Sequence, residues 1–171
     1  MQKYIILLSW PSCSWKSTVS DTLFEKYPWI FRVKSDSIKR FISWYTPNLY
    51  VNNVTNMCFA LCESAMQEWF SLLCEIRFTL DTYQALAEKY EYKIVTVNLE
   101  APYEILEKRF SERVTAYKES WSKWYMNTDM GRFTSMYEKY MTDKIDATMS
   151  FDTSKVTVDE TIKTIDNYIQ E

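Results

Sequence analysis

Short apolar segments alternate with longer amphipathic segments along the whole chain, and this alternation strongly limits the fold. Strands are predicted at residues 3–9, 31–34, 70–74, 93–99 and 148–151. Helices are predicted between and after them, at residues 16–27, 37–43, 53–68, 82–90, 102–117, 131–141 and 158–169. Strands that alternate with helices form a parallel sheet covered on both faces. The sequence therefore predicts an α/β fold with a five-stranded, mostly parallel sheet.

No repeat, low-complexity tract or linker interrupts this order, so residues 1–171 are predicted to form a single domain. Residues 45–51, around Pro47, are predicted to be irregular. The helix at residues 53–68 carries an apolar face made of Met57, Ala60, Leu61 and Ala65.

The charge balance excludes some classes of protein. A formal net charge of -3 argues against a protein that coats nucleic acid or lies on a membrane surface. The N-terminal apolar run is too short to span a bilayer, and no cleavage-site pattern follows it. We expect a cytoplasmic protein that does not bind membranes.

The absence of histidine excludes Ser-His-Asp and Cys-His catalysis and histidine-bound metals. A general base must then be a carboxylate or, much less commonly, Lys, Tyr or Cys. The cysteines are Cys13, Cys58, Cys62 and Cys74. Cys58 and Cys62 could pair as metal ligands, but without histidine or a CxxC motif they have few partners. Reduced, buried thiols are the simpler interpretation.

The segment that joins the first strand to the first helix contains a Lys-Ser pair. It reads, in order, Ser9, Trp10, Pro11, Ser12, Cys13, Ser14, Trp15, Lys16, Ser17 and Thr18. The phosphate-binding pattern G-x-x-x-x-G-K-[ST] occupies the same place, between a strand and a helix. Lys16 and Ser17 match this pattern, and both mismatches are tryptophans, Trp10 and Trp15, at its glycine positions.

With glycine at positions 10 and 15, the segment would contain GPSCSGKST and resembles the Walker A loop of small P-loop kinases with an AAA-type ATP-binding site. Zeta-toxin-like, polynucleotide-kinase-like and chloramphenicol-phosphotransferase-like proteins are the members that the chain resembles over essentially its whole length. The resemblance implies a three-layer P-loop NTPase fold with a small lid, and phosphoryl transfer that uses ATP and Mg²⁺. It also implies that residues 10–18 bind the nucleotide, that Lys16 reaches the β- and γ-phosphates, and that Ser17 offers its hydroxyl to Mg²⁺.

The two tryptophans conflict with this role. Backbone N–H groups must wrap the phosphates closely, which requires open backbone angles and no Cβ at the points of approach. Two explanations compete. The chain is a degenerate pseudokinase that acts as a binding module, or the Trp letters are glycines translated with the wrong genetic code, because UGA is read as tryptophan in some codes and as glycine in others.

The glycine and tryptophan content favours miscoding. Gly131 is the only glycine in the chain, although average usage would give about a dozen. All the tryptophans are predicted at turns or helix ends, where glycine has a structural role. They are Trp10, Trp15, Trp29, Trp44, Trp69, Trp121 and Trp124. The alternative is that they are genuine exposed aromatic residues that bind a partner.

The acceptor residues are predicted from the ends of the second and third strands. In the kinases that the chain resembles, an Asp at the place of Asp36 acts as the general base for the acceptor hydroxyl. The family often continues Asp-x-x-Arg, whereas Lys39 and Arg40 follow here, so the cation is undecided. Asp36 could also cap a helix. Glu75, followed by Arg77, resembles the acid that orders Mg²⁺-bound water or grips the acceptor; a solvated loop carboxylate is the alternative.

Arg109 and Arg113 lie four residues apart and hence on one face of their helix. In the kinases that the chain resembles, this helix leads into the lid. There the two guanidinium groups clamp phosphate oxygens and stabilise charge in the transition state. Residues 114–130 would be the lid, which excludes water during transfer. A solvated helix surface shared with neighbouring glutamates is the alternative interpretation of the arginine pair.

The sequence thus predicts a kinase that passes a phosphoryl group from ATP to a hydroxyl or phosphate of a small-molecule or nucleotide acceptor. Lys16, Asp36, Arg109 and Arg113 are its predicted catalytic residues. No nucleic-acid surface is expected, and an antitoxin partner would be expected only for a zeta-type toxin.

Overall fold

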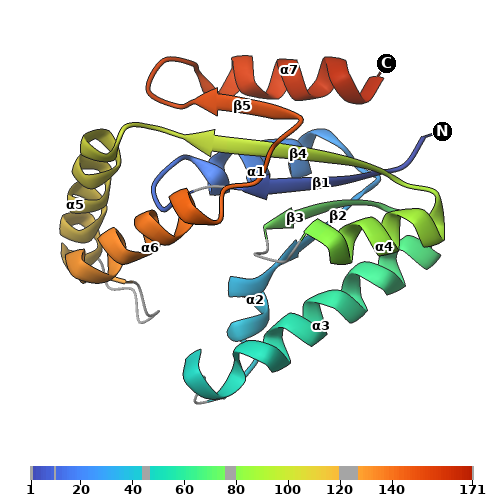
Figure 1. Cartoon of the computed structure of the whole chain (residues 1–171), viewed down its shortest axis with the longest axis horizontal. Coiled ribbons are helices and arrows are strands. Elements are labelled where there is room, and N and C mark those ends of the chain that lie inside the picture. The colour runs from blue at the N-terminus through green and yellow to red at the C-terminus, as the bar shows by residue number, and fades with distance from the viewer. Residues whose placement is uncertain (1, 10, 44–46, 76–79, 120–126, 171) are drawn as a thin grey trace.

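The computed structural model describes residues 2–9, 11–43, 47–75, 80–119 and 127–170 (Figure 1). Its elements follow in the order β1 (Tyr4–Ser9), α1 (Lys16–Lys26), β2 (Ile30–Lys34), α2 (Ser35–Lys39), α3 (Pro47–Gln67), β3 (Ser71–Glu75), α4 (Leu80–Tyr90), β4 (Lys93–Glu100), α5 (Tyr103–Glu119), α6 (Met130–Thr142), β5 (Met149–Asp152) and α7 (Val158–Gln170). Each of the five predicted strands is present, within one residue of its expected bounds.

The five strands form one parallel sheet in the order β2-β3-β1-β4-β5. β1 is central and pairs with β3 on one side and β4 on the other. Its residues Tyr4 to Leu8 are buried, as expected for a strand covered on both faces. The arrows in Figure 1 point the same way, so the carboxyl ends of the strands meet at one edge, where parallel sheets bind ligands.

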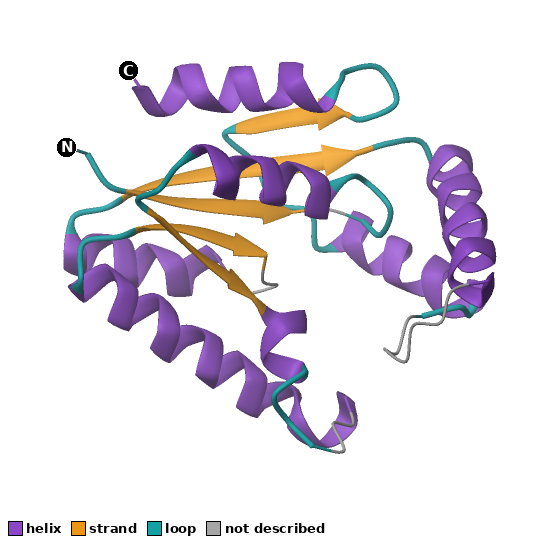
Figure 2. Ribbon diagram, turned by 180° about the vertical axis from the view of Figure 1, so that it is seen from behind, coloured by secondary structure: helices purple, strands orange, loops and turns teal. Residues whose placement is uncertain are grey.

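Alternate residues of β1 face opposite layers of helices. Ile6 and Leu8 belong to a core cluster with side chains of α1 and α7, the helices on the near side of the sheet in Figure 2. Ile5 and Leu7 belong to a second cluster with side chains of α3 and α4. The predicted α/β class, with helices on both faces of the sheet, is therefore confirmed.

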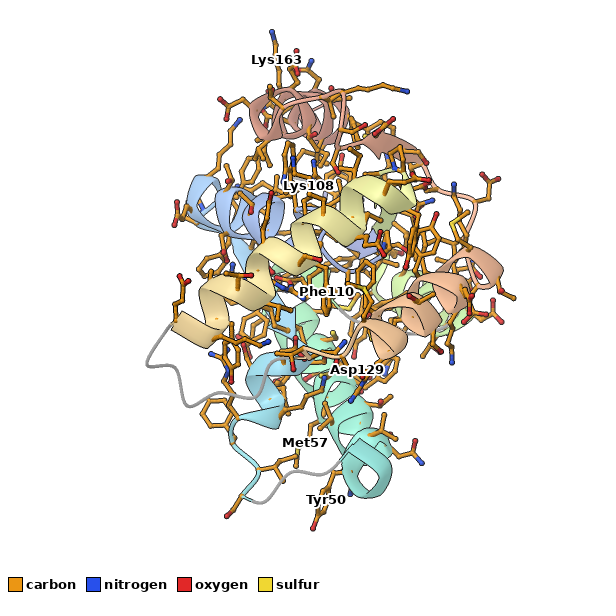
Figure 3. The ribbon with its side chains drawn as sticks, turned by 90° about the vertical axis from the view of Figure 1, so that its left-hand side faces the viewer. Tyr50, Met57, Lys108, Phe110, Asp129 and Lys163 are labelled. Atoms are coloured by element: carbon orange, nitrogen blue, oxygen red, sulfur yellow. The ribbon has the colours of Figure 1, made fainter. Side chains whose placement is uncertain are left out.

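A third cluster lies beyond the carboxyl end of β4, between α5 and α6. The rings of Phe110 and Phe133 stack with their centroids 4.5 Å apart, next to the buried Leu106. Figure 3 labels Phe110 below the ribbon of α5. Cys13, from the loop after β1, packs against this cluster, so the cluster links α5 to the loop.

The structure corrects two helix predictions. The segment 45–51 was predicted to be irregular, but from Pro47 onward it is the first part of α3. Proline suits a first helical turn because its fixed φ is helical and its missing N–H has no intrahelical partner there. The helix predicted at residues 37–43 is instead α2, which starts directly after β2 and ends at Lys39. The residues after it continue in tighter turns, with Phe41 N–H donating to the Ile38 carbonyl at 3.0 Å.

The side of α3 that packs on the sheet is offset from the apolar face read in the sequence. Its buried residues include Val54, Cys58, Cys62, Ala65 and Met66. Of the four residues in the expected face, only Ala65 is buried, whereas Met57 and Leu61 are 49% and 36% exposed. Apolar residues lie on more than one side of this helix, so the periodicity of the sequence did not identify the side that packs on the sheet.

Within the described residues, no helix is both long and apolar enough to cross a membrane.

Candidate functional site

The loop between β1 and α1 is compact. Pro11 and Ser14 are buried, and the Ser14 hydroxyl donates a hydrogen bond to the Pro11 carbonyl at 2.9 Å. Cys13 and Trp15 have φ angles of 70° and 64°, in the left-handed region that favours glycine. Ser12 lies in the same turn, and Trp10 lies outside the described residues.

The N-terminus of α1 follows this loop. The N-cap residue Trp15 makes no side-chain hydrogen bond to the first turn, and that turn contains no acidic residue. Ser17 and Thr18 are exposed there, beside Lys16. Backbone N–H groups and the helix dipole make such an end suited to an anion, and a lysine adds positive charge.

Glu75, the last residue of β3, lies directly beside Lys16. Lys16 Nζ is 3.0 Å from Glu75 Oε2, and Lys34 Nζ is 2.9 Å from Glu75 Oε1. The Ser20 hydroxyl also donates to Oε1, and the Glu75 side chain is only 2% exposed. Glu75 is therefore a buried ionic partner of the loop lysine, and its interpretation as a solvated loop carboxylate is wrong. No sequence pattern marked Lys34 or Ser20 as a partner of Glu75.

Asp36 lies in the first turn of α2, at the carboxyl end of β2. Its carboxylate is exposed and pairs with Lys39, at 2.6 Å from Oδ1 to Nζ. Partial desolvation by the surrounding protein acts to raise the pKa of this carboxyl, but the hydrogen bond and charge of Lys39, with the charges of Lys16 and Arg40, lower it below its usual value. Asp36 is not a helix cap, because the N-cap of α2 is Lys34.

Of the two predicted acceptor cations, Arg40 is exposed at the end of α2. Arg77 lies outside the described residues.

Arg109 joins α5 to two other parts of the site. Its guanidinium donates to the Thr153 hydroxyl at 2.9 Å, to the Thr153 carbonyl at 2.8 Å and to the Cys13 carbonyl at 3.4 Å. It also lies over the Trp15 ring, 4.5 Å from the centroid. The alternative of a solvated helix surface is wrong for Arg109, which is half-buried.

Arg113, one turn further along α5, is exposed and lies over the Phe110 ring at 5.6 Å. The charges of both arginines affect the pKa of Cys13. Burial raises the pKa of the Cys13 thiol, and the charges of Arg113 and Arg109 oppose this rise. Arg109 thus contacts the loop directly, whereas Arg113 lies over Phe110, in the cluster against which Cys13 packs.

The predicted lid, residues 114–130, is only partly described. α5 continues to Glu119, and residues 120–126 lie outside the described residues. The segment resumes before α6, whose N-cap is Asp129, labelled in Figure 3. Asp129 Oδ1 accepts a hydrogen bond from the Arg132 N–H at 2.6 Å.

A cavity of about 430 Å³ opens beside Pro11, at the carboxyl ends of β4 and β5. Tyr140, Lys144 and Phe151 are among its lining residues, together with Glu100. Lys144 pairs with Glu100 at 2.8 Å. A volume of this size suits a small-molecule group, next to the start of the loop.

The tryptophans in the described part of the chain differ in whether their backbone conformation favours glycine. Trp69 has a φ of 63° and follows α3 in a Schellman motif, in which Phe70 N–H donates to the Ala65 carbonyl at 3.0 Å. Trp15 is left-handed as well, whereas Trp29 has no positive φ and packs half-buried against the core. Outside the described residues lie Trp10, Trp44, Trp121 and Trp124.

The cysteines of α3 and β3 are buried together. Cys62 Sγ lies 3.8 Å from Cys74 Sγ, and burial, with the nearby Cys62, raises the pKa of Cys58 to about 11. The described residues contain no group of three or more Cys, Asp or Glu side chains that could hold a metal ion by themselves.

No protein-family model and no curated protein sequence matches the chain. Solved structures do match it. A protein from Chloroflexus aurantiacus, described as a kinase by inference, superposes with a TM-score of 0.70 at 13% identity over 98% of both chains. Shikimate kinase from Aquifex aeolicus superposes with a TM-score of 0.55 at 12% identity, over 96% of this chain and 95% of that one.

A chain of the Pnkp1/Rnl/Hen1 RNA repair complex is also similar, with a TM-score of 0.60 at 20% identity. The match covers 85% of this chain and 47% of that chain. At these identities the likeness concerns the fold: the chain shares the α/β fold of these solved structures.

Proposed function

We propose that the protein is an ATP- and Mg²⁺-dependent phosphotransferase that acts on a hydroxyl or phosphate of a small-molecule or nucleotide acceptor. The observation that carries this proposal is the position of Lys16 and Ser17. They begin α1 directly after the loop from the central strand. Asp36 lies just after β2 and Glu75 is the last residue of β3, both at the same edge of the sheet.

Lys16 is proposed to bind the β- and γ-phosphates, and the backbone N–H groups of residues 10–18 to surround them. The exposed Ser17 hydroxyl fits one ligand position of a nucleotide-bound Mg²⁺, a cation usually held by few protein oxygens, water and phosphates. When bound, Mg²⁺ would neutralise charge on the transferring phosphate.

Asp36 is proposed to accept the proton of an acceptor hydroxyl. Meanwhile the hydroxyl oxygen forms a bond to the γ-phosphorus, and the bond between the γ-phosphorus and the β-phosphate oxygen breaks. Its lowered pKa keeps the carboxylate ionised at neutral pH, as a base requires. Glu75, Arg40 and Arg77 are proposed to position the acceptor or the Lys16 side chain. The acceptor itself would approach from the side of α2.

Arg109 and Arg113 are proposed to stabilise negative charge on the phosphates from the lid side. The contacts of Arg109 with Cys13 and Thr153 support this role, because they hold its guanidinium against the loop. Residues 114–130 are proposed to close over the nucleotide. The free cysteines, of which Cys58, Cys62 and Cys74 are buried and Cys13 is half-buried, agree with a cytoplasmic protein.

Positions 10 and 15 are proposed to be glycine in the protein made by its own cell. The left-handed φ of Trp15 supports this, because a bulky L-residue is strained there. Its indole also lies under the Arg109 guanidinium, beside the surface that the phosphates would need. UGG codons at these positions in the gene would contradict this proposal.

The test is calorimetric titration of Mg-ATP into the chain as written and into its Trp10→Gly, Trp15→Gly variant. Binding to the glycine variant alone would support both the kinase function and miscoding. If neither protein binds Mg-ATP, the pseudokinase binding module becomes the better explanation. A positive result leads to assays of phosphoryl transfer with panels of sugars, nucleosides and nucleotides.

A further inference from the structure

We propose that Lys34 is a positioning residue: it holds the Glu75 carboxylate in place when the Lys16 side chain leaves that carboxylate to bind nucleotide phosphates. This inference rests on the proposed function. Lys34 precedes Asp36 by two residues and lies outside the phosphate loop, so no motif marks it.

The register of the sheet brings the two side chains together. Lys34 and Glu75 are directly paired residues on the neighbouring parallel strands β2 and β3, so their side chains leave the same face of the sheet. The Lys34 ammonium lies 2.9 Å from Glu75 Oε1, and Lys16 lies 3.0 Å from Oε2. The two lysines thus hold different oxygens of one buried carboxylate.

Lys34 is itself anchored from α1. Asp21 Oδ1 accepts a hydrogen bond from Lys34 Nζ at 2.9 Å and also pairs with Arg32 on the same strand. Burial acts to raise the pKa of Asp21, but its hydrogen bonds and charge pairing with Lys34 and Arg32 lower it. Asp21, Lys34, Glu75 and Lys16 therefore form a row of alternating charges that runs from the surface to the loop.

This row matters when Lys16 changes partner. A buried carboxylate left without a countercharge is costly. If Lys16 moves to the β- and γ-phosphates, Glu75 still has Lys34 and the Ser20 hydroxyl. Lys34 thus lowers the free-energy cost of moving Lys16 away from Glu75, and it affects nucleotide affinity through Glu75.

The experiment measures Mg-ATP affinity by calorimetry in the Trp10→Gly, Trp15→Gly background. Lys34→Met should bind roughly 10- to 100-fold more weakly, the range expected when a buried carboxylate loses a countercharge. Lys34→Arg should recover most of the affinity. In a Glu75→Gln background, Lys34→Met should change affinity by less than about threefold, because a neutral amide needs no countercharge.

Arg32→Met is the matched control, because Arg32 shares Asp21 with Lys34 but lies two residues earlier, at a position paired with Leu73 and not with Glu75. It should stay within about threefold of the parent. Thermal unfolding of each variant confirms that it is folded. Unchanged affinity in Lys34→Met, or an equal loss in the Glu75→Gln background, would overturn this inference and leave the proposed function standing. A parent that does not bind Mg-ATP would overturn both.

Discussion

Trp69→Gly and Trp69→Ala remove the same indole, so the stability difference between these two variants reports on the backbone alone. Trp69 has a φ of 63° in the Schellman motif after α3 and is 70% exposed. Alanine in the left-handed region costs about 1–2 kcal/mol. Glycine costs about 0.4–1 kcal/mol relative to alanine, through the greater freedom of the unfolded chain.

The midpoints of these two ranges leave Trp69→Gly more stable than Trp69→Ala by about 0.8 kcal/mol. At Trp29 the order should reverse. That residue lies in a turn without a positive φ, so alanine should be the more stable by about 0.4–1 kcal/mol. Glu91, with a φ of 60° after α4, is a control free of tryptophan, and Glu91→Gly should exceed Glu91→Ala in stability.

The assay is urea unfolding of the six variants, with the slopes compared to check that the unfolded states are alike. Thermal midpoints should differ by roughly 2–4 °C per kcal/mol. If alanine matches or exceeds glycine at position 69, the left-handed backbone there does not limit stability. The same result at both 69 and 91 would refute the argument from φ altogether.

Further predictions concern the site and one helix cap. Lys16→Met should lower phosphoryl transfer by about 100- to 1,000-fold while circular dichroism shows an intact fold; transfer at the parent's rate would contradict its role. Asp36→Asn should lower kcat by about 100-fold with Mg-ATP affinity unchanged, and a loss confined to affinity would count against a base. Lys39→Met should move the acid limb of the pH–rate profile to higher pH, because Lys39 lowers the pKa of Asp36 and the base acts when ionised; an unmoved limb would exclude Asp36 as the group that titrates. Asp129→Ala should cost about 1 kcal/mol in urea unfolding, because the Arg132 N–H loses its cap; Asp129→Asn, which can still accept that bond, should cost less.

The sequence predicted the order of strands and helices because the signals are local. An apolar run with turn residues at its ends marks a buried strand whatever surrounds it. The Lys16-Ser17 pair could be placed for the same reason, since it depends only on a strand before it and a helix after it. The spacing of Arg109 and Arg113 fixed their shared helix face in the same way.

Contacts between distant segments could not be predicted in this way. The buried face of α3 depends on which side meets the sheet, and its apolar residues permit more than one choice. The sequence left open whether Glu75 was a solvated loop carboxylate, because its burial depends on Lys34 from β2 and on Lys16 and Ser20 from α1. The link from Arg109 to Thr153 joins residues 44 positions apart.

The sequence by itself thus determined the α/β class and the place of the proposed phosphate loop, because both follow from patterns within about ten to twenty residues. Only the tertiary structure decided that Glu75 lies between two lysines and that Trp15 has a left-handed backbone beneath Arg109. Strand register and the crossing of α5 over the loop create these contacts, and neither is encoded in any single segment.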